Sequence, residues 1–399
     1  MYSVVIVGGG IVGLASALRL KEANPKLKIA VVEKEDHLAT HQTGHNSGVI
    51  HSGLYYKPGS YKAKNCVEGY KSLVQFCQEE EIPFELCGKI VVATSKDQLP
   101  ALNTLEERGK ANGLDGIIRL ESKEALQEYE PYVNGVAGLY IPQTGIVDYK
   151  LVAEKYAEKF RHFGGEIFTQ NKVKKIVSDG KLLQVLTDKE RLVTGFVIHC
   201  GGLQSDQLAK ISSIKVDYKI IPFRGEYYKL KANKEHLVKN LIYPVPDPNF
   251  PFLGVHFTRM IGGGIEAGPN AVLAYKREGY SKSDINLKEL MESLTYKGFR
   301  KVAAKYWKTG LGEFYRSYSK SAFTKALQEL LPDIQKQDLV PGGAGVRAQA
   351  CDKEGGLIDD FLIVEDERIL NVGNAPSPAA TSSLAIGQRI ADITLKKIA

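Results

Sequence analysis

The chain has 399 residues, 43% of them hydrophobic and 25% charged, with a formal net charge of +7. This length exceeds one ordinary hydrophobic core and predicts two domains, and no run approaches the ~20 apolar residues that a membrane-spanning helix needs. The basic excess is modest and spread along the chain, without a basic block or nucleic-acid motif, so neither DNA nor RNA is an expected partner.

The cysteines indicate a reducing compartment. There are five, an odd number, widely spaced and never in a C-x-x-C pair. We therefore expect reduced thiols in a cytoplasmic protein. The positive charge would also suit loose contact with an anionic membrane, so peripheral association with the inner face of the cell membrane stays open.

The segment from Val4 to Ala15 is an apolar run that ends in G-x-G-x-x-G and continues as a helical pattern. This order predicts a buried strand, a phosphate-binding turn and a helix whose N-terminus faces the phosphates. Gly8 permits the tight turn, Gly10 lets the backbone approach a pyrophosphate, and Gly13 lets the helix lie close on the sheet.

A second apolar run, 29–32, ends in Glu33, which is placed to accept the hydroxyl protons of an adenosine ribose and to repel a 2′-phosphate. This favours FAD or NAD over NADP. The alternative is a glycine-rich turn in another kind of α/β protein. A signal peptide is not expected, because no basic residues precede the apolar run and Arg19 and Lys21 interrupt it.

The next segment, Gly44 to Tyr56, holds three glycines, small polar residues and two histidines. Such a composition suits backbone wrapped closely around a ligand rather than a core. His37, His41 and His45 recur every four residues, but Gly44 and the absence of a nearby second ligand cluster argue against a metal, so none is expected.

The middle of the chain alternates helices and short strands. The helices predicted from apolar periodicity are 61–81, 99–112, 122–129 and 149–163, the last with Asp148 as N-cap. The predicted strands are 88–94, 138–141, 166–169, 172–178, 182–187 and 191–193. A further strand, 196–200, a turn at Gly201 and a helix from Leu203 predict a second approach of backbone to the same nucleotide.

Residues 218–332 change to alternating apolar and polar positions, which predicts an antiparallel sheet with proline-rich turns between 244 and 251. Adjacent strands are expected at 254–258 and 262–264, and helices at 287–294, 296–307 and 324–331. The segment Lys297 to Lys320 mixes basic and aromatic residues. It is interpreted either as a membrane-docking surface or, preferably, as a helical cover with its aromatic side chains in the core.

The C-terminal part returns to the character of a nucleotide-binding domain. It contains the glycine-rich segment Gly342 to Arg347, strands at 361–364 and 369–374, and the segment Ser377 to Ser383, which opens a last helix through Ile393. The N-terminus of that helix would suit an anionic centre, such as the N1–C2=O2 edge of a reduced flavin.

Taken together, these segments resemble the D-amino-acid-oxidase-like FAD oxidoreductases, which include sarcosine oxidases and glycerol-3-phosphate dehydrogenases. Within that superfamily the likeness is greatest to the L-2-hydroxyglutarate dehydrogenase/oxidase family. The matching segments span nearly the whole chain and comprise residues 8–17 with Glu33, 43–56, 88–93, 222–225, 254–258, 268–270, 345–347 and 371–384. Among them the sequence N-S-G-V-I-H-S-G-L-Y-Y is the most discriminating.

The resemblance implies an α/β fold (α+β overall), with a Rossmann-like FAD-binding domain and a second domain built on a mainly antiparallel sheet. The FAD-binding domain is expected to comprise 1–85, 148–217 and 333–399, and the substrate-binding domain 86–147 and 218–332. FAD is expected to bind noncovalently, and no link to Cys351 is predicted. The residues expected to bind it are Gly8, Gly10, Gly13, Glu33, Thr43, Asn46, Ser47, Val173, Gly201, Gly373, Thr381 and Ser382.

The implied reaction is oxidation of L-2-hydroxyglutarate to 2-oxoglutarate, with hydride transfer to flavin N5. The hydroxyl proton needs an acceptor, and a neutral His, with a reference pKa of ~6.5, suits that role. His51 is the first candidate, since a glycine-flanked His in the loop beside the flavin has little reason to pack. His256 is the second, although a hydrogen-bonded sheet histidine without a catalytic role is equally expected.

Arg347 is the candidate for binding the C1 carboxylate of the substrate through a bidentate pair, although an Arg paired with Asp352 or Glu354 would look the same in sequence. Arg259, Lys57 and Tyr228 are candidates for the distal carboxylate, without a preferred one among them.

Two other functions remain open at this point. One is a related FAD oxidoreductase that acts on another 2-hydroxy acid, glycerol 3-phosphate or an amino acid, and the other is a flavin-binding module without turnover. The electron acceptor, oxygen or a membrane quinone, is not decided by the sequence.

Overall fold

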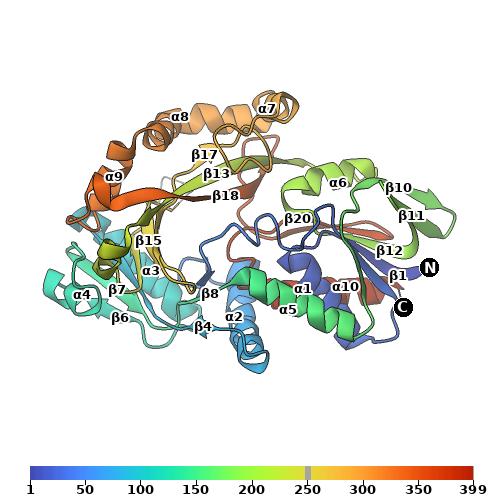
Figure 1. Ribbon diagram of the computed structural model, residues 1–399, viewed down its shortest axis with the longest axis horizontal. Helices are drawn as coiled ribbons and strands as arrows, with labels where there is room; N and C mark the ends of the chain where they lie inside the picture. Colours follow the sequence, from blue (N-terminus) through green and yellow to red (C-terminus); the bar gives the residue numbers. More distant parts are fainter. Residues whose placement is uncertain (248–252, 399) are drawn as a thin grey trace.

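A computed structural model of the chain describes residues 1–247 and 253–398. The protein is elongated, with two large sheets side by side and helices over their outer faces (Figure 1). Part of the proline-rich segment predicted between 244 and 251 lies outside the described residues.

The first sheet is mostly parallel and has eight strands in the described part of the chain. Its order is β10-β11-β12-β1-β2-β9, with β20 beside β12 and β19 beside β20. Residues Val4 to Ile6 are fully buried, because β1 lies in the middle of the sheet and is covered on both faces. The strands are β1 (Tyr2–Val7), β2 (Ile29–Val32), β9 (Glu166–Phe168), β10 (Val173–Asp179), β11 (Leu182–Thr187), β12 (Arg191–His199), β19 (Leu362–Glu365) and β20 (Ile369–Asn374).

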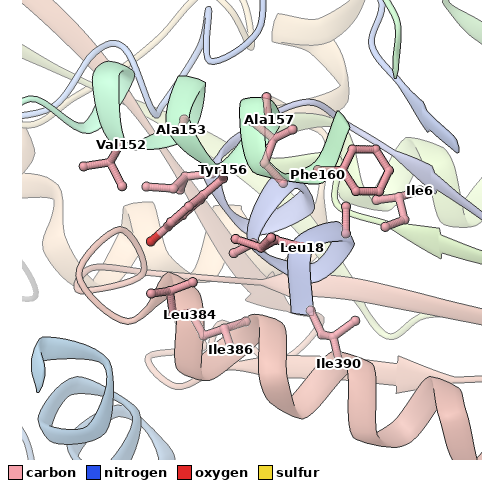
Figure 2. Packing of buried hydrophobic residues seen from close by; sticks show 14 of the residues in the cluster. Ile6, Leu18, Val152, Ala153, Tyr156, Ala157, Phe160, Leu384, Ile386 and Ile390 are labelled. Atoms are coloured by element: carbon pink, nitrogen blue, oxygen red, sulfur yellow. The ribbon is translucent and has the colours of Figure 1, made fainter. Parts of the chain in front are cut away.

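Helices lie on both faces of this sheet, and the unit is of the predicted α/β type. On one face lie α1 (Ile11–Ala23), α5 (Tyr149–His162) and α10 (Ser383–Ile398), with α2 (Tyr61–Glu79) packed outside α10. Figure 2 shows Tyr156 and Phe160 of α5 on one side of Leu18 and Ile390 of α10 on the other. On the opposite face α6 (Ser205–Ile211) contributes to a second apolar cluster.

The second sheet has nine strands in the described residues and is mainly antiparallel, as predicted, with one parallel pair between β5 and β14. The strands are β5 (Lys89–Ala93), β6 (Ile118–Leu120), β7 (Ala137–Ile141), β13 (Tyr218–Leu230), β14 (Leu241–Pro244), β15 (His256–Arg259), β16 (Ile265–Gly268), β17 (Val272–Leu273) and β18 (Leu339–Asp352). A small third sheet joins β3 (Val49–Ile50), β4 (Phe84–Glu85) and β8 (Gly145–Val147).

In the described residues, five helices accompany the second sheet. α3 packs on one face, while α4 and α9 pack on the other and α8 covers the end near β17 and β18. They are α3 (Leu99–Ala111), α4 (Lys123–Tyr129), α7 (Leu287–Leu294), α8 (Lys297–Tyr318) and α9 (Lys320–Gln328). No helix in the described residues is both long enough and apolar enough to span a membrane.

The longest pairing in the molecule corrects one expectation about the domains. β18 is antiparallel to β13 over nearly its whole length, with Arg347 opposite Phe223. The segment 342–347 therefore belongs to the second sheet, although its glycines suggested the nucleotide-binding domain. The sheets divide between β18 and β19, not at residue 333.

Three local expectations were also wrong. β12 is one continuous strand rather than two, because its start pairs with β11 and its end with β1 and β20. Residues 262–264 form the turn between β15 and β16, closed by the Met260 N–H donating to the Gly264 carbonyl at 3.0 Å. α8 continues to Tyr318 through a kink at Tyr306, whose φ and ψ are −111° and 20°.

Candidate active site

A cavity of about 1270 Å³ lies between the two sheets. Its walls include Val7 and Val32 at the carboxyl ends of β1 and β2, and Tyr243, His256 and Arg347 from the second sheet. The carboxyl edge of a parallel sheet is where α/β folds bind ligands. The volume exceeds the ~300–1,000 Å³ typical of small-molecule pockets, so the cavity has room for a dinucleotide and a small substrate.

The glycine turn is built as the sequence predicts. Gly8 has a φ of +119°, and a Cβ there would lie 2.4 Å from the Cys200 carbonyl oxygen. A Cβ on Gly13 would lie 2.0 Å from the Gly8 carbonyl oxygen, so this glycine lets α1 start directly against the turn. Gly8 and Gly10 line the cavity, whereas Gly13 supports them from behind.

The N-terminus of α1 fits a phosphate group. Its N-cap residue is Gly10, which has no side chain to satisfy the first backbone N–H groups. Only Ile11 N–H is occupied by a side chain, donating to Thr43 Oγ1 at 3.0 Å. The remaining N–H groups and the positive end of the helix dipole face the cavity and would hold the pyrophosphate.

Glu33 is fixed at the end of β2 by two backbone donors. Gly9 N–H donates to its Oε2 at 2.7 Å, and Glu35 N–H donates to its Oε1 at 2.9 Å. A carboxylate oxygen can accept more than one hydrogen bond. Glu33 lines the cavity and therefore keeps acceptor capacity for ribose hydroxyl groups.

Most other residues predicted to bind the cofactor also line this cavity. They are Thr43, Asn46, Ser47, Val173, Gly201, Gly373 and Thr381. Thr381 joins two segments, since its Oγ1 accepts from His51 N–H at 3.1 Å and lies 2.7 Å from Tyr149 Oη. Ser382 is buried behind the cavity wall, where its Cα lies 2.5 Å from the position of a Cβ on Gly69 of α2.

A group of titratable side chains near one end of the cavity has the spacing of a metal site. Ligand atoms of Glu35, His41 and Glu278 lie within 4.8 Å of one another. The Lys34 ammonium, however, occupies this group, with Nζ 2.8 Å from His41 Nε2 and 3.0 Å from Glu278 Oε2. The positive charge that these carboxylates need therefore comes from lysine.

The two candidate histidines lie in the same cavity. His51 follows β3, and its Nε2 is 3.4 Å from Ser377 Oγ. His256 begins β15, and its Nδ1 is 3.0 Å from the Gly254 carbonyl oxygen. A carbonyl oxygen only accepts, so Nδ1 of His256 carries the proton and Nε2 presents a lone pair.

Both histidines are neutral at physiological pH. Burial is the main cause that lowers the pKa of His51 to about 3 and that of His256 to about 4, and the charge of Lys89 contributes to both shifts. Each imidazole is thus in the form that accepts a proton.

Arg347, on β18, lines the same cavity as these histidines. Burial lowers its pKa, an effect opposed by Asp359 and Tyr56. Asp359 also binds Lys62, whose Nζ lies 2.8 Å from Asp359 Oδ1. The two acids that the sequence suggested as partners of Arg347 bind elsewhere. Glu354 pairs with Lys301, and Asp352 Oδ1 accepts from the backbone of Gly356 at 2.8 Å.

None of the three residues considered for the distal carboxylate lines the cavity in the described structure. Arg259 donates to Glu85 at 2.6 Å, and the ring of Tyr228 packs on Phe323 with a centroid distance of 4.9 Å. Lys57 is exposed. Lys89, Tyr55 and Tyr243 form a group next to His256 that was not predicted. The lysine at the start of the apolar run 89–93 was a signal of an unusual buried charge.

Comparisons with known proteins agree with this geometry. The family model described as FAD dependent oxidoreductase matches residues 3–393. The chain belongs to this family.

Two similar proteins share one name within the FAD-dependent oxidoreductases. The chain is 62% identical to an L-2-hydroxyglutarate dehydrogenase of Indibacter alkaliphilus, over 99% of both chains. It is also 47% identical to the mitochondrial L-2-hydroxyglutarate dehydrogenase of Homo sapiens, covering 98% of this chain and 88% of that protein.

Solved structures show the same fold. The L-alpha-glycerophosphate oxidase of Mycoplasma pneumoniae with FAD bound superposes with a TM-score of 0.80 at 25% identity, covering 99% of this chain and 94% of that one. The glycine oxidase of Geobacillus kaustophilus has a TM-score of 0.75 at 17% identity, covering 99% and 95% of the two chains. FAD is therefore the cofactor of this oxidoreductase, and the uncapped helix, Glu33 and the cavity volume fit it.

Proposed function

We propose that this oxidoreductase uses FAD to convert L-2-hydroxyglutarate to 2-oxoglutarate. The observation that supports it most is that neutral His51, neutral His256 and Arg347 all line the same cavity. A 2-hydroxy acid offers a carboxylate for an arginine and a hydroxyl proton for a neutral imidazole. The names of the similar dehydrogenases support the choice of 2-hydroxy acid.

Each residue then has a defined task. Arg347 binds the C1 carboxylate through its planar guanidinium and so orients C2. His51 accepts the proton of the C2 hydroxyl group, and His256, whose Nε2 is unprotonated, is the second candidate for this proton. When bound, FAD supplies the two-electron acceptor for the hydride from C2 at its N5 atom.

The charge around the cavity favours a dianion over an amino acid. Lys62 and Lys89 act electrostatically on His51, and Arg347 acts on Lys62. Asp359 is the acid that opposes the charges of Lys62 and Arg347. This excess of positive charge complements a dianion. An amino acid would bring an ammonium group into the same surroundings, where like charges repel.

The test is anaerobic titration of the purified FAD enzyme with both enantiomers of 2-hydroxyglutarate, followed by the flavin spectrum. We expect the L enantiomer to bleach the flavin stoichiometrically and the D enantiomer to leave it oxidised. Arg347 fixes the C1 carboxylate and His51 fixes the C2 hydroxyl group, so only one enantiomer directs its C2 hydrogen toward the flavin. Glycerol 3-phosphate and glycine serve as controls. Preferential bleaching by either control would contradict the proposed substrate, and bleaching by none would indicate a flavin-binding module without turnover.

We also propose that the outer surface of α7 and α8 docks on an anionic membrane and that a membrane quinone is the electron acceptor. Residues 285–318 hold eight of the fourteen exposed large hydrophobic side chains in the described part of the chain. Trp307, Leu311, Tyr315 and Tyr318 recur at helical spacing and so share one face of α8. On α7 the exposed residues are Leu287, Met291 and Leu294.

The sequence of this surface favours a lipid partner. Residues 282–320 hold nine Lys and Arg but four Asp and Glu, so the basic excess is concentrated here rather than spread along the chain. A helix with apolar residues on one face and basic residues beside them is typical of interfacial membrane binding. α8 also has an inward face, with Phe299, Tyr306 and Phe314 in a core cluster. It therefore combines both interpretations of the segment Lys297 to Lys320.

A further inference from the structure

Lys89 is a buried cation beside the active site that the proposed chemistry does not use. It begins β5 and is 1% exposed. Its Nζ lies 4.4 Å from the ring centre of Tyr55 and 5.0 Å from that of Tyr243. No Asp or Glu of the described residues forms an ion pair with it. Aromatic faces compensate a buried ammonium only in part.

Lys89 is close to the catalytic groups. The ring of Tyr243 also contacts that of His256, with a centroid distance of 4.0 Å, so this tyrosine touches both the lysine and the histidine. On the other side Cys66 Sγ donates to the His51 carbonyl at 3.4 Å, and Cys66 interacts electrostatically with Lys89. The lysine thus lies behind both histidines.

The titratable groups that face Lys89 carry no negative charge at neutral pH. Burial raises the pKa of Tyr55 and Tyr243 and that of the Cys66 thiol, so these groups stay protonated. His51 and His256 stay neutral. Burial also lowers the pKa of Lys89 itself, to about 7. The protein without substrate therefore lacks a counter-charge at this position.

We propose that Lys89 is a positioning residue whose counter-charge is the dianionic substrate: a dicarboxylate bound in the cavity draws a proton from solvent onto Lys89, and the charge of the buried ammonium then attracts the dianion through the cavity wall. The inference rests on the proposed function, because it requires a substrate with two carboxylates. In this proposal the preference for dianionic substrates comes from Lys89, which does not line the cavity.

Proton uptake follows from linkage between the two events. A nearby anion raises the pKa of an amine, so substrate binding and proton binding strengthen each other. Below the pKa of the free enzyme Lys89 is already charged and little uptake occurs. Above it, each dicarboxylate that binds brings a proton with it, and the affinity falls by up to about tenfold per pH unit.

The experiment is calorimetric titration of the FAD-loaded enzyme with glutarate, which lacks the oxidisable hydroxyl group. Buffers of different ionisation enthalpy give the number of protons taken up. We expect little uptake at about pH 6 and close to one proton at about pH 8.5. Absence of uptake at the higher pH, with glutarate bound, would overturn the inference without any variant.

Variants identify the group. Lys89→Met should take up no proton, lose the pH dependence and bind glutarate at least about tenfold more weakly at the lower pH. Lys89→Arg should keep the affinity at both pH values without uptake, because arginine stays charged. Lys110→Met, on the exposed side of α3, is the matched control and should behave as the parent enzyme. Undiminished uptake in Lys89→Met would also overturn the inference.

The results distinguish a wrong substrate from a wrong role of Lys89. If glutarate does not bind and L-2-hydroxyglutarate does not bleach the flavin, the proposed substrate is wrong. If L-2-hydroxyglutarate bleaches the flavin while glutarate binds without proton uptake, only the role of Lys89 is wrong.

Discussion

At the scale of single residues, the decisive property of the site is the protonation state of its two histidines. Burial holds the pKa of His51 and His256 well below neutrality, so both are proton acceptors over the whole physiological range. They differ in their fixed partners. The Nδ1 of His256 is tied to a carbonyl oxygen at 3.0 Å, whereas the Nε2 of His51 faces a serine hydroxyl at 3.4 Å.

We therefore expect His51→Ala to slow anaerobic flavin reduction by L-2-hydroxyglutarate by roughly 10²- to 10⁴-fold, the range for loss of a general base. His256→Ala is the comparison, with a smaller effect. In the parent enzyme at saturating substrate, the rate should stay level from about pH 8 to about pH 6 and fall only as the neutral imidazole is protonated at lower pH. Stopped-flow absorbance measures both. A near-normal rate in His51→Ala would transfer the role to His256.

Sequence and structure agree best at this scale where a residue's role depends on its neighbours in the chain. Gly8, Glu33 and His51 were identified because each lies in a local pattern. Lys89 was not identified, because its role depends on its contacts with Tyr55 and Tyr243. These tyrosines lie beside it only after β5 has paired with β14. Likewise Arg259 looked suitable until the structure placed Glu85 at 2.6 Å from it.

At the scale of elements, the junction between β1 and α1 carries the cofactor. The helix begins so close to the turn that a side chain on Gly13 would meet the Gly8 backbone. Relief of that contact must move α1 away from the turn, and its free N–H groups move with it.

Gly13→Ala is therefore expected to weaken FAD binding by at least about tenfold, which corresponds to loss of about one charge-assisted hydrogen bond. Fluorescence titration of the apoprotein with FAD measures the change. Gly310→Ala is the control, because α8 has nothing within 4 Å of that position. Unaltered FAD affinity in Gly13→Ala would show that the turn tolerates the displacement.

Element types were predictable wherever the apolar period was strong, and errors occurred where pairing is remote in sequence. α5 and its Asp148 cap followed from the local pattern, and Asp148 indeed accepts from Lys150 N–H at 2.8 Å. The position of β18 did not, because its partner β13 lies more than a hundred residues earlier. Glycines in 342–347 serve a strand there, not a phosphate turn.

At the scale of the whole molecule, positive charge and exposed apolar side chains occur together on α7 and α8, along one edge of the structure (Figure 1). The nucleotide half has no comparable surface among its described residues. If this edge meets a membrane, binding should need both anionic lipid and the apolar residues.

We expect the enzyme to sediment with vesicles of phosphatidylcholine and phosphatidylglycerol but weakly with phosphatidylcholine alone, and salt of about 0.5 M should release part of it. Replacing Trp307, Leu311 and Tyr315 with Ser should reduce binding by about tenfold or more, since each buried apolar group contributes. Ser at Ile118 and Tyr132 is the control, because both residues are exposed and Ile118 lies on β6, at the edge of the second sheet opposite β17. Equal binding to both vesicle types would contradict an electrostatic membrane contact.

The arrangement of the first sheet also bears on how the protein is made. β1 is paired with β12 and covered by α10. The glycine turn at residues 8–13 is therefore surrounded by segments that come much later in the chain, up to residue 200 and at 383–398. A ribosome synthesises the turn first and its cover last. The packing of α10 against α1 can therefore form only after residue 398 has left the ribosome, and a message that ends before α10 would yield a chain that lacks this cover, although every residue of the glycine turn is present.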